Sequence, residues 1–286
     1  MSVLDIVDLT LRQGHRDLYQ GMQFSVERGE AWMILGENGS GKSTLLAAIA
    51  GWHPRPRGEV HLLGRRIQDW SPNARARHLA WLPQSDEQPF SSTVMGKVLS
   101  GRYPHLGRWS WESSQDHAIA MLQLHRLDLD SLAHRNVNAL SGGERRRSSL
   151  AATLAQQADV LLLDEPLSQL DLRHQQQVLA ILREERSARR SLLVIGHDPN
   201  HARAFASHVL LLFGEGHWLA GPVDQILTAT NLSALYRHPV HALTIHAETW
   251  FVPAHTVPDK LLQDPGHTAE SSSSTPPALT SGDMSA

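Results

Sequence analysis

A glycine-rich segment is the part of the chain best suited to chemistry. It runs Gly36-Glu37-Asn38-Gly39-Ser40-Gly41-Lys42-Ser43-Thr44 and matches the pattern G-x-x-x-x-G-K-[S/T] in full. Its glycines allow backbone N–H groups to turn inward around phosphate oxygens, and a following helix points its positive end at them. In such a loop Lys42 reaches the β- and γ-phosphates and Ser43 ligates Mg²⁺. The segment predicts a nucleotide-phosphate site, a feature that kinases, GTPases, helicases and transport ATPases share.

A second chemical feature is a pair of carboxylates after a short apolar run. The run Val160 to Leu163 ends at Asp164 and Glu165. At the end of a buried strand, Asp164 can hold Mg²⁺ through water, and Glu165 can orient and deprotonate an attacking water molecule. Taken alone, such a pair is more often an ordinary helix cap. Together with Lys42, the pair indicates nucleotide hydrolysis.

A third feature, Leu140-Ser141-Gly142-Gly143-Glu144, precedes the acidic pair. Its spacing fits a capping box, with Ser141 as the N-cap and Glu144 at the third helical position. A helix that begins with two glycines also exposes backbone N–H groups without side chains in the way, which an anion such as a γ-phosphate requires. The two interpretations are compatible, so the stretch predicts a helix start that also contacts phosphate.

The order of these features resembles the ATP-binding-cassette (ABC) family, whose signature Leu-Ser-Gly-Gly-Gln lies ahead of an Asp-Glu strand. The resemblance covers roughly Val3 to Leu243, and Glu144 replaces the usual Gln. Gln84 matches the family's Q-loop, which contacts Mg²⁺ and water and moves with a helical subdomain. Ser168-Gln169-Leu170-Asp171 matches the loop that crosses to the partner subunit. His197 matches the switch histidine that contacts γ-phosphate, although a lone strand-end histidine is more often structural.

One family element departs from the pattern. The family usually stacks adenine on an aromatic side chain near the N-terminus, and the corresponding position falls at about Gln13. His15 lies close by, and Tyr19 comes several residues late. We therefore expect weak recognition of the base. His15 could stack on adenine, but a polar residue in an exposed loop more often has no such role.

The resemblance implies ATP and Mg²⁺ as cofactors and assigns a role to each matched residue. Catalysis falls to Lys42, Glu165 and His197, and Mg²⁺ binding to Ser43, Gln84 and Asp164. The residues that contact the nucleotide would be Gly36, Glu37, Asn38, Gly39, Ser40, Gly41, Lys42, Ser43, Thr44, Gln84, Ser141, Gly142, Gly143 and Asp164. In this family two subunits sandwich two ATP molecules, which implies a homodimer in the ATP-bound state.

The partners follow from the same resemblance. Because no run approaches the ~18–20 apolar residues of a spanning helix, the permease subunits must be separate polypeptides. Importers commonly keep the two apart, so we expect an importer with a substrate-binding protein, its ATPase lying peripherally on the cytoplasmic face of the inner (plasma) membrane. The segment Gly101-Arg102-Tyr103-Pro104-His105 resembles one common among ATPases of iron–siderophore, haem and cobalamin importers, although a Pro-containing turn would also explain it. Trp109-Ser110-Trp111 could face a partner.

Two other functions compete with transport. A soluble ABC ATPase could act in assembly or nucleic-acid repair without a permease, but such proteins usually carry two cassettes or a long coiled-coil insertion, and this chain shows no heptad array. A nucleotide-sensing scaffold conflicts with the intact set of Lys42, Asp164, Glu165 and His197. The net charge of −3 also argues against a nucleic-acid partner.

The elements that must position these residues follow from apolar patterning. Alternation in Leu4 to Leu11, Met22 to Val26 and Val60 to Leu63 predicts a small antiparallel N-terminal sheet. Continuous apolar runs at Ala31 to Leu35 and Ser191 to Ile195, like that before Asp164, predict buried parallel strands with crossover helices. Helical spacing over about Ser91 to Ala158 predicts an inserted α-helical subdomain. The expected fold class is α/β, an ABC-type P-loop NTPase core with both additions.

Composition sets the remaining expectations. The absence of cysteine excludes disulfides, thiolate metal sites and a thiol nucleophile. The start of the chain shows no secretory signal. We expect one ATP-binding domain over residues 1–263, its helical subdomain at about 88–150, and a disordered Ser/Thr/Pro-rich tail over 264–286. Arg145 to Arg147 are expected on a solvated helix face. The loose spacing of His238, His241, His246 and His255 gives little support to a metal site.

Overall fold

A six-stranded sheet forms the centre of the protein in the computed structural model, which describes residues 2–13, 16–52, 57–85, 91–107 and 110–254. The strand order is β10-β9-β3-β8-β7-β6, with parallel pairing from β9 to β6 and antiparallel pairing only between β9 and β10. The strands are β3 (Ala31–Gly36), β6 (Leu79–Leu82), β7 (Val160–Asp164), β8 (Ser191–Ile195), β9 (His208–Gly214) and β10 (His217–Pro222). Every residue of β3, β7 and β8 is buried, as continuous apolar runs require.

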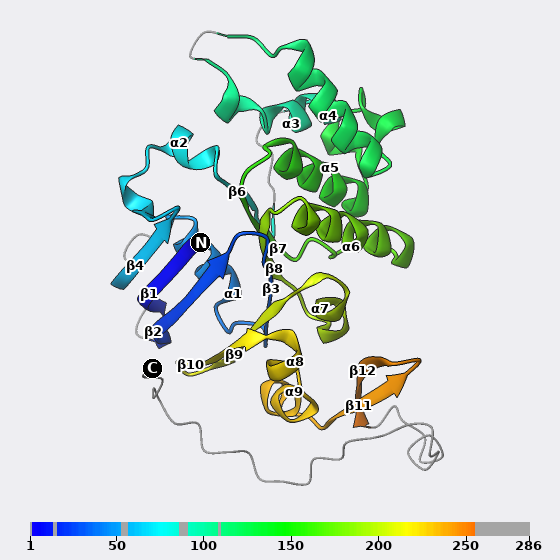
Figure 1. Ribbon diagram of the computed structural model, residues 1–286. Helices are drawn as coiled ribbons and strands as arrows, with labels where there is room; N and C mark the ends of the chain where they lie inside the picture. The colour runs from blue at the N-terminus through cyan, green and yellow to red at the C-terminus, as the bar shows by residue number, and fades with distance from the viewer. Residues whose placement is uncertain (1, 14–15, 53–56, 86–90, 108–109, 255–286) are drawn as a thin grey trace.

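A second, antiparallel sheet covers one side of the central sheet (Figure 1). Its order is β2-β1-β4-β5, and its strands are β1 (Ser2–Gln13), β2 (Arg16–Glu27), β4 (Arg57–Leu62) and β5 (Arg65–Arg66). Helix α1 (Lys42–Ile49) supplies Leu45, Leu46 and Ile49 to the hydrophobic core shared by the two sheets. The predicted N-terminal sheet is therefore confirmed. Together with the central sheet, it packs around α1 and so supports the helix that follows the glycine-rich loop.

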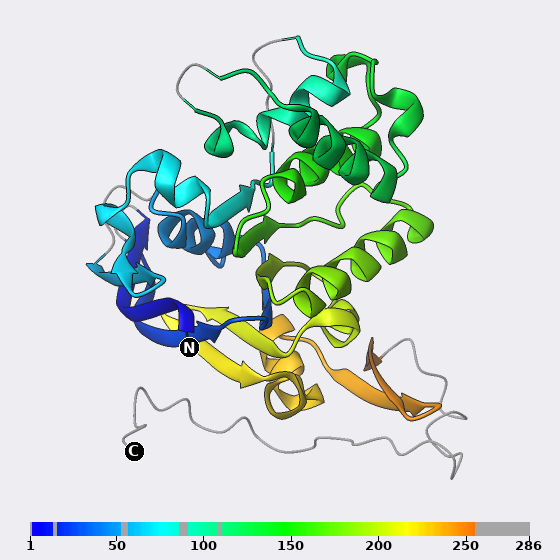
Figure 2. The same cartoon turned by 45° about the horizontal axis from the view of Figure 1, so that its top comes forward.

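Helices cover the other face of the central sheet. Figures 1 and 2 both place α3, α4 and α5 together at one end of the molecule and the β11–β12 hairpin at the other. These helices are α3 (Val94–Ser100), α4 (Ser114–Arg126), α5 (Gly142–Ala155), α6 (Leu172–Ser187), α7 (Pro199–Phe205), α8 (Val223–Ile226) and α9 (Ala229–Tyr236), and the hairpin joins β11 (Val240–Ile245) to β12 (Glu248–Pro253). The short helix α2 (Pro72–Ala76) has no buried residue and lies beside β6. Short 3-10 turns lie at Ile67–Asp69, Tyr103–His105, Asp130–Leu132 and Val137–Ala139. Helix α5 runs five residues past the position 150 at which we expected the helical subdomain to end.

Polar caps define where the helices of this layer begin. Ser113 and Asp116 form a capping box at the start of α4, and Ser141 and Glu144 form one at the start of α5. The capping box predicted from the Ser-Gly-Gly-Glu spacing is thus present. Each box satisfies backbone N–H groups that a helix start leaves without partners, so the sequence sets these starts locally.

The expectation of a solvated arginine face on α5 is wrong for two of its three residues. Arg145 is exposed, whereas only 6% of Arg146 and 7% of Arg147 is accessible to solvent. Both buried guanidinium groups donate to backbone carbonyls, which compensates them for the loss of water. Arg147 binds the carbonyls of Leu127 and Asp128 at the end of α4, while Arg146 binds carbonyls beside the candidate site.

Candidate functional site

The glycine-rich loop joins β3 to α1 at the carboxyl edge of the parallel strands. Gly41 caps α1 in the left-handed conformation (φ 90°), and a Cβ there would lie 3.0 Å from both Leu18 Cδ1 and Tyr19 Oη. A Cβ on Gly36 would lie 2.7 Å from the Leu212 carbonyl oxygen. The buried Tyr19 hydroxyl donates to the Ser40 carbonyl from beneath the loop. The loop is therefore shaped by positions where only glycine fits and by a phenol that supports it.

Lys42 begins α1 with its ammonium group turned back over the loop. Its Nζ donates to the carbonyl oxygens of Gly36 at 2.8 Å and Glu37 at 3.0 Å, and the residue is only 7% exposed. Burial lowers the pKa of Lys42, while the carboxylates of Glu165 and Asp164 oppose that shift. A buried cation held at the mouth of a glycine loop that opens a helix can bind phosphate oxygens.

Asp164, the last residue of β7, lies beside Ser43. Only 1% of the residue is exposed, and Oδ1 is buried without a hydrogen-bond partner among the described residues. Burial raises the pKa of Asp164, and a hydrogen bond from Ser43 works against that rise. A buried carboxylate oxygen without a partner, next to a serine hydroxyl, is the hard oxygen donor set that Mg²⁺ prefers. These residues therefore fit a magnesium site.

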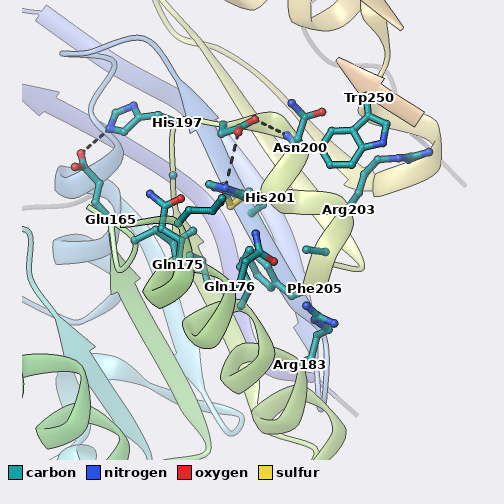
Figure 3. Close-up of a pocket in the computed structure, with 18 of the residues that line it drawn as sticks. Glu165, Gln175, Gln176, Arg183, His197, Asn200, His201, Arg203, Phe205 and Trp250 are labelled. Carbon is teal, nitrogen blue, oxygen red and sulfur yellow. Dashed lines mark hydrogen bonds and ion pairs between the residues drawn. The ribbon is translucent and has the colours of Figure 1, made fainter. Parts of the chain in front are cut away.

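The Glu165 carboxylate contacts two side chains that follow different strands of the central sheet. Its Oε1 accepts a hydrogen bond from Gln84 Nε2 at 3.0 Å and lies 2.8 Å from His197 Nε2. Figure 3 shows the imidazole of His197 directed at this carboxylate. Gln84 follows β6 and His197 follows β8, on either side of β7 in the sheet. The sequence features thus converge because neighbouring parallel strands end at one edge.

The backbone of Glu165 is unusual for a residue with a side chain. Its φ is +53°, in the left-handed region, and its N–H donates to the Ile195 carbonyl at 3.1 Å. L-residues rarely adopt this conformation unless surrounding contacts hold them in it. The conformation indicates that the direction of this carboxylate is imposed by the fold.

The Ser141 turn packs against a different loop. Within the described part of the chain, the hydrogen bonds of Ser141 stay in its own helix start. Its Oγ accepts from the Glu144 N–H at 3.3 Å, and its N–H donates to Glu144 Oε2 at 2.8 Å. These bonds also lower the pKa of Glu144. Gly142 and Gly143 lie against Gln169, so close that a Cβ would sit 2.6 Å from Gln169 Oε1 or 2.9 Å from its carbonyl oxygen. The structure thus joins the Ser141 turn to the loop 168–171.

A cavity of about 980 Å³ extends from the site between α6, α7 and the β11–β12 hairpin. Glu165 and His197 line one end of it, and Arg203 and Trp250 line the other (Figure 3). Arg183 of α6 also lines it. The cavity gives the Glu165–His197 pair access to solvent, and His197 is half exposed.

Two residues that contribute to the site were not identified from sequence. Tyr19 was considered only as a stacking partner for adenine, a role that its complete burial excludes. Arg146 was expected to be solvated, yet it lies one helical turn before Leu150 and two turns before Leu154 on the buried side of α5. That periodic spacing was the signal for Arg146. The side chain of Gln13 and all of His15 lie outside the described residues.

Two other segments singled out in the sequence lie partly or wholly within the described residues. Tyr103–His105 forms a short 3-10 turn, and the preceding Arg102 is buried in an ion pair with Asp116. Among the described residues, which include His238, His241 and His246 but not His255, no three metal-ligating side chains gather. No helix in the described part of the chain is long and apolar enough to cross a membrane.

The chain is similar in sequence to ATP-binding proteins of ABC transporters. The sequence pattern of the ABC transporter family matches residues 19–168. The chain is 39% identical to the hemin import ATP-binding protein HmuV of Streptomyces coelicolor over 232 residues, 81% of this chain and 82% of that protein. It is 37% identical to the achromobactin transport ATP-binding protein CbrD of Dickeya dadantii, over 82% of this chain and 88% of that one.

A solved structure shows the same likeness in three dimensions. It is the inward-facing conformation of an ABC transporter provisionally described as of the metal-chelate type. The two structures superpose with a TM-score of 0.76 at 31% sequence identity, over 92% of this chain and 100% of that one. The α/β core, antiparallel sheet and helical layer are thus those of an ABC ATPase. The chain belongs to the ABC transporter family, as one of its ATP-hydrolysing subunits.

Proposed function

We propose that this chain hydrolyses ATP to drive import of a metal chelate, a haem or a ferric siderophore first and cobalamin second, through separate permease subunits. The relatives support the cargo class, because those compared above are named for hemin and achromobactin transport. The observation that carries hydrolysis is the contact of Gln84 and His197 with one carboxylate oxygen of Glu165, beside Asp164 and Lys42.

Each residue then has a chemical role. Backbone N–H groups of residues 36–44 and the Lys42 ammonium bind the phosphates, and Lys42 offsets charge that develops on the γ-phosphate. Ser43, Asp164 and Gln84 would hold Mg²⁺. The bound ion would supply charge neutralisation at the phosphates. Glu165 orients the attacking water and accepts its proton, while His197 holds Glu165 in place and donates toward the γ-phosphate.

The assembly is part of the proposal. Ser141, Gly142 and Gly143 would complete the site of a second copy, giving a homodimer in the ATP-bound state. The dimer would lie peripherally on the cytoplasmic face of the inner membrane, bound to its permease and served by a substrate-binding protein. Family membership supports this arrangement, since ABC subunits of this kind act with membrane partners.

Transport by reconstituted vesicles tests the proposal. The chain is assembled with its co-purified membrane partner, and ATP hydrolysis is measured beside uptake of labelled haem, a ferric siderophore or cobalamin. We expect ATP-dependent uptake of one chelate, and none with the Glu165→Gln variant. Outward movement of a lipid or peptide would contradict import, and hydrolysis with no membrane partner at all would favour a soluble ATPase acting in assembly or repair.

The Gln84→Ala variant separates hydrolysis from coupling in the same vesicles. It removes one polar contact to Glu165 and one of the three side chains proposed to hold Mg²⁺. Because Ser43, Asp164 and the catalytic residues remain, basal hydrolysis should fall only moderately. Uptake should fall much further if Gln84 joins the site to the permease-contacting helical layer. Equal losses of uptake and hydrolysis would contradict a coupling role for Gln84.

A further inference from the structure

Arg146 connects helix α5 to the backbone of the candidate site. Its guanidinium donates to the carbonyl oxygens of Pro83 at 2.7 Å, Gln84 at 3.3 Å and Glu165 at 3.2 Å. It also donates to the carbonyl of Asp164. One buried cation on α5 thus binds the end of β7 and the segment that follows β6.

These carbonyls belong to the residues whose side chains meet. Gln84 and Glu165 contact each other through Nε2 and Oε1, and Arg146 binds the backbone of both. Glu165 also holds a left-handed backbone conformation that its surroundings must maintain. Its N–H is held by the Ile195 carbonyl, and its own carbonyl is held by Arg146. The direction of the carboxylate therefore depends on Arg146 as well as on β8.

A planar guanidinium suits this task better than other side chains. It presents several N–H donors in a fixed fork, so one group can bind carbonyls from two chain segments at once. A lysine ammonium is more compact and more strongly hydrated, and a glutamine amide has fewer donors.

We propose that Arg146 is a positioning residue for ATP hydrolysis. It fixes the backbones of Gln84 and Glu165 relative to each other and connects both to α5. The proposal rests on the proposed ATPase function. Because Ser141 is the N-cap of α5, the same arginine links the Ser-Gly-Gly turn to the carboxylate edge. A displacement of α5 would therefore be transmitted to the backbone of Glu165.

Arg147 provides a matched control on the same helix. It is a buried arginine of similar exposure that also donates to backbone carbonyls. Its partners, Leu127 and Asp128, lie at the end of α4 within the helical layer. Loss of Arg147 should lower stability without touching Gln84 or Glu165.

The test compares Arg146→Gln, Arg146→Lys and Arg147→Gln in the purified full chain. For each variant we would measure kcat and KM for ATP, the Kd for a non-hydrolysable ATP analogue and the thermal midpoint. We expect Arg146→Gln to lower kcat roughly tenfold or more while Kd changes less than about threefold. Arg146→Lys should recover part of kcat, and Arg147→Gln should lower the thermal midpoint while keeping kcat near that of the wild type.

Two results would overturn the proposal. One is a wild-type kcat in Arg146→Gln, and the other is a parallel loss of kcat, affinity and thermal midpoint in both Arg146→Gln and Arg147→Gln. If Arg146→Gln does not fold, a wild-type kcat in Arg146→Lys with its altered fork would count equally against it. Failure of the wild-type chain to hydrolyse ATP, alone or with its permease, would instead refute the proposed function.

Discussion

At the scale of single residues, Glu165 is the point where the site is most constrained. Its carboxylate meets Gln84 and His197 through one oxygen, its carbonyl accepts from Arg146, and its backbone is left-handed. Only 16% of its side chain is exposed. These contacts hold Oε1, whereas Oε2 takes part in no hydrogen bond or ion pair among the described residues. A carboxylate with one oxygen held and the other open can accept a proton from water as a general base.

The Glu165→Gln variant should retain ATP binding and lose turnover. The carboxamide keeps the shape and one hydrogen-bond acceptor, but it cannot take a proton from water, so kcat should fall by roughly a hundredfold or more. Lys42→Ala should instead weaken binding itself, since it removes the ammonium from the phosphate loop. Calorimetric titration and phosphate release on both variants check this, and wild-type turnover in Glu165→Gln would refute the assignment of the base.

Base recognition gives a second residue-scale prediction. Tyr19, the nearest aromatic considered, is buried beneath the phosphate loop and cannot stack on adenine. Most of the binding free energy would then come from phosphates and Mg²⁺, so ATP and GTP should bind with affinities within roughly tenfold of each other. Competition binding measures the ratio. A selectivity of about a hundredfold or more would reveal a base contact, for which His15 would be the first candidate to mutate.

At the scale of elements, the sequence predicted the strands that carry the site better than the contacts between layers. Buried parallel strands are continuous apolar runs, so β8 was predicted residue for residue and β7 to within its last residue. The resemblance to the ABC family assigned Lys42, Asp164, Glu165 and His197 to one site, and the shared carboxyl edge of these strands explains why the structure brings them together. The β11–β12 hairpin was not predicted, because most of its residues are only partly buried and its alternation is weak.

The arginines of α5 show why some of the site could not be predicted. A run of charged residues on a helix normally indicates a solvated face. The spacing of Arg146 from Leu150 and Leu154 indicates burial, but no local pattern shows which backbone carbonyls its guanidinium binds. Arg146 finds its partners 18 to 63 positions away along the chain. Such partners depend on how α5 packs on β6 and β7, which is a property of the tertiary fold.

The Arg102–Asp116 pair gives an element-scale prediction. It joins the segment before Tyr103 to the start of α4, and Arg102 also donates to the Ala155 carbonyl at the end of α5. Hydrogen bonds from Ser113 and Arg102 lower the pKa of Asp116 from 3.8 to about 2. A lowered carboxyl pKa stabilises the fold above the unfolded value, and the stabilisation is lost as pH falls from 3.8 toward 2.

Asp116→Asn should therefore lower the free energy of unfolding by about 2 kcal/mol at neutral pH, because a buried guanidinium loses its charged acceptor. The gap between wild type and variant should close as pH falls below 3.8. Denaturant unfolding at several pH values measures both curves. A gap that stays constant down to pH 2 would show that the charge on Asp116 contributes nothing.

At the scale of the whole molecule, the two halves of the proposed nucleotide site belong to different layers. Lys42 starts α1 between the two sheets, whereas Ser141 caps α5 in the helical layer. Among the described residues, Ser141 forms hydrogen bonds only within its own turn. Gly142 and Gly143 are held against Gln169 instead of against the phosphate loop. If Ser141 contacts ATP, it would do so for a second copy of the chain.

Mixed dimers test this arrangement. A Lys42→Ala subunit keeps its Ser141 turn, and a Ser141→Arg subunit keeps its phosphate loop, so a dimer of the two contains one complete site if the halves combine across the interface. Since a random mixture pairs unlike subunits half the time, it should recover up to about a quarter of wild-type turnover, while each variant alone stays inactive. Thermal midpoints of the single variants control for loss of the Ser141 cap, which costs about 1 kcal/mol. If the mixture is as inactive as the two variants while Ser141→Arg still binds ATP, each subunit must complete its own site, and the crossed dimer is wrong.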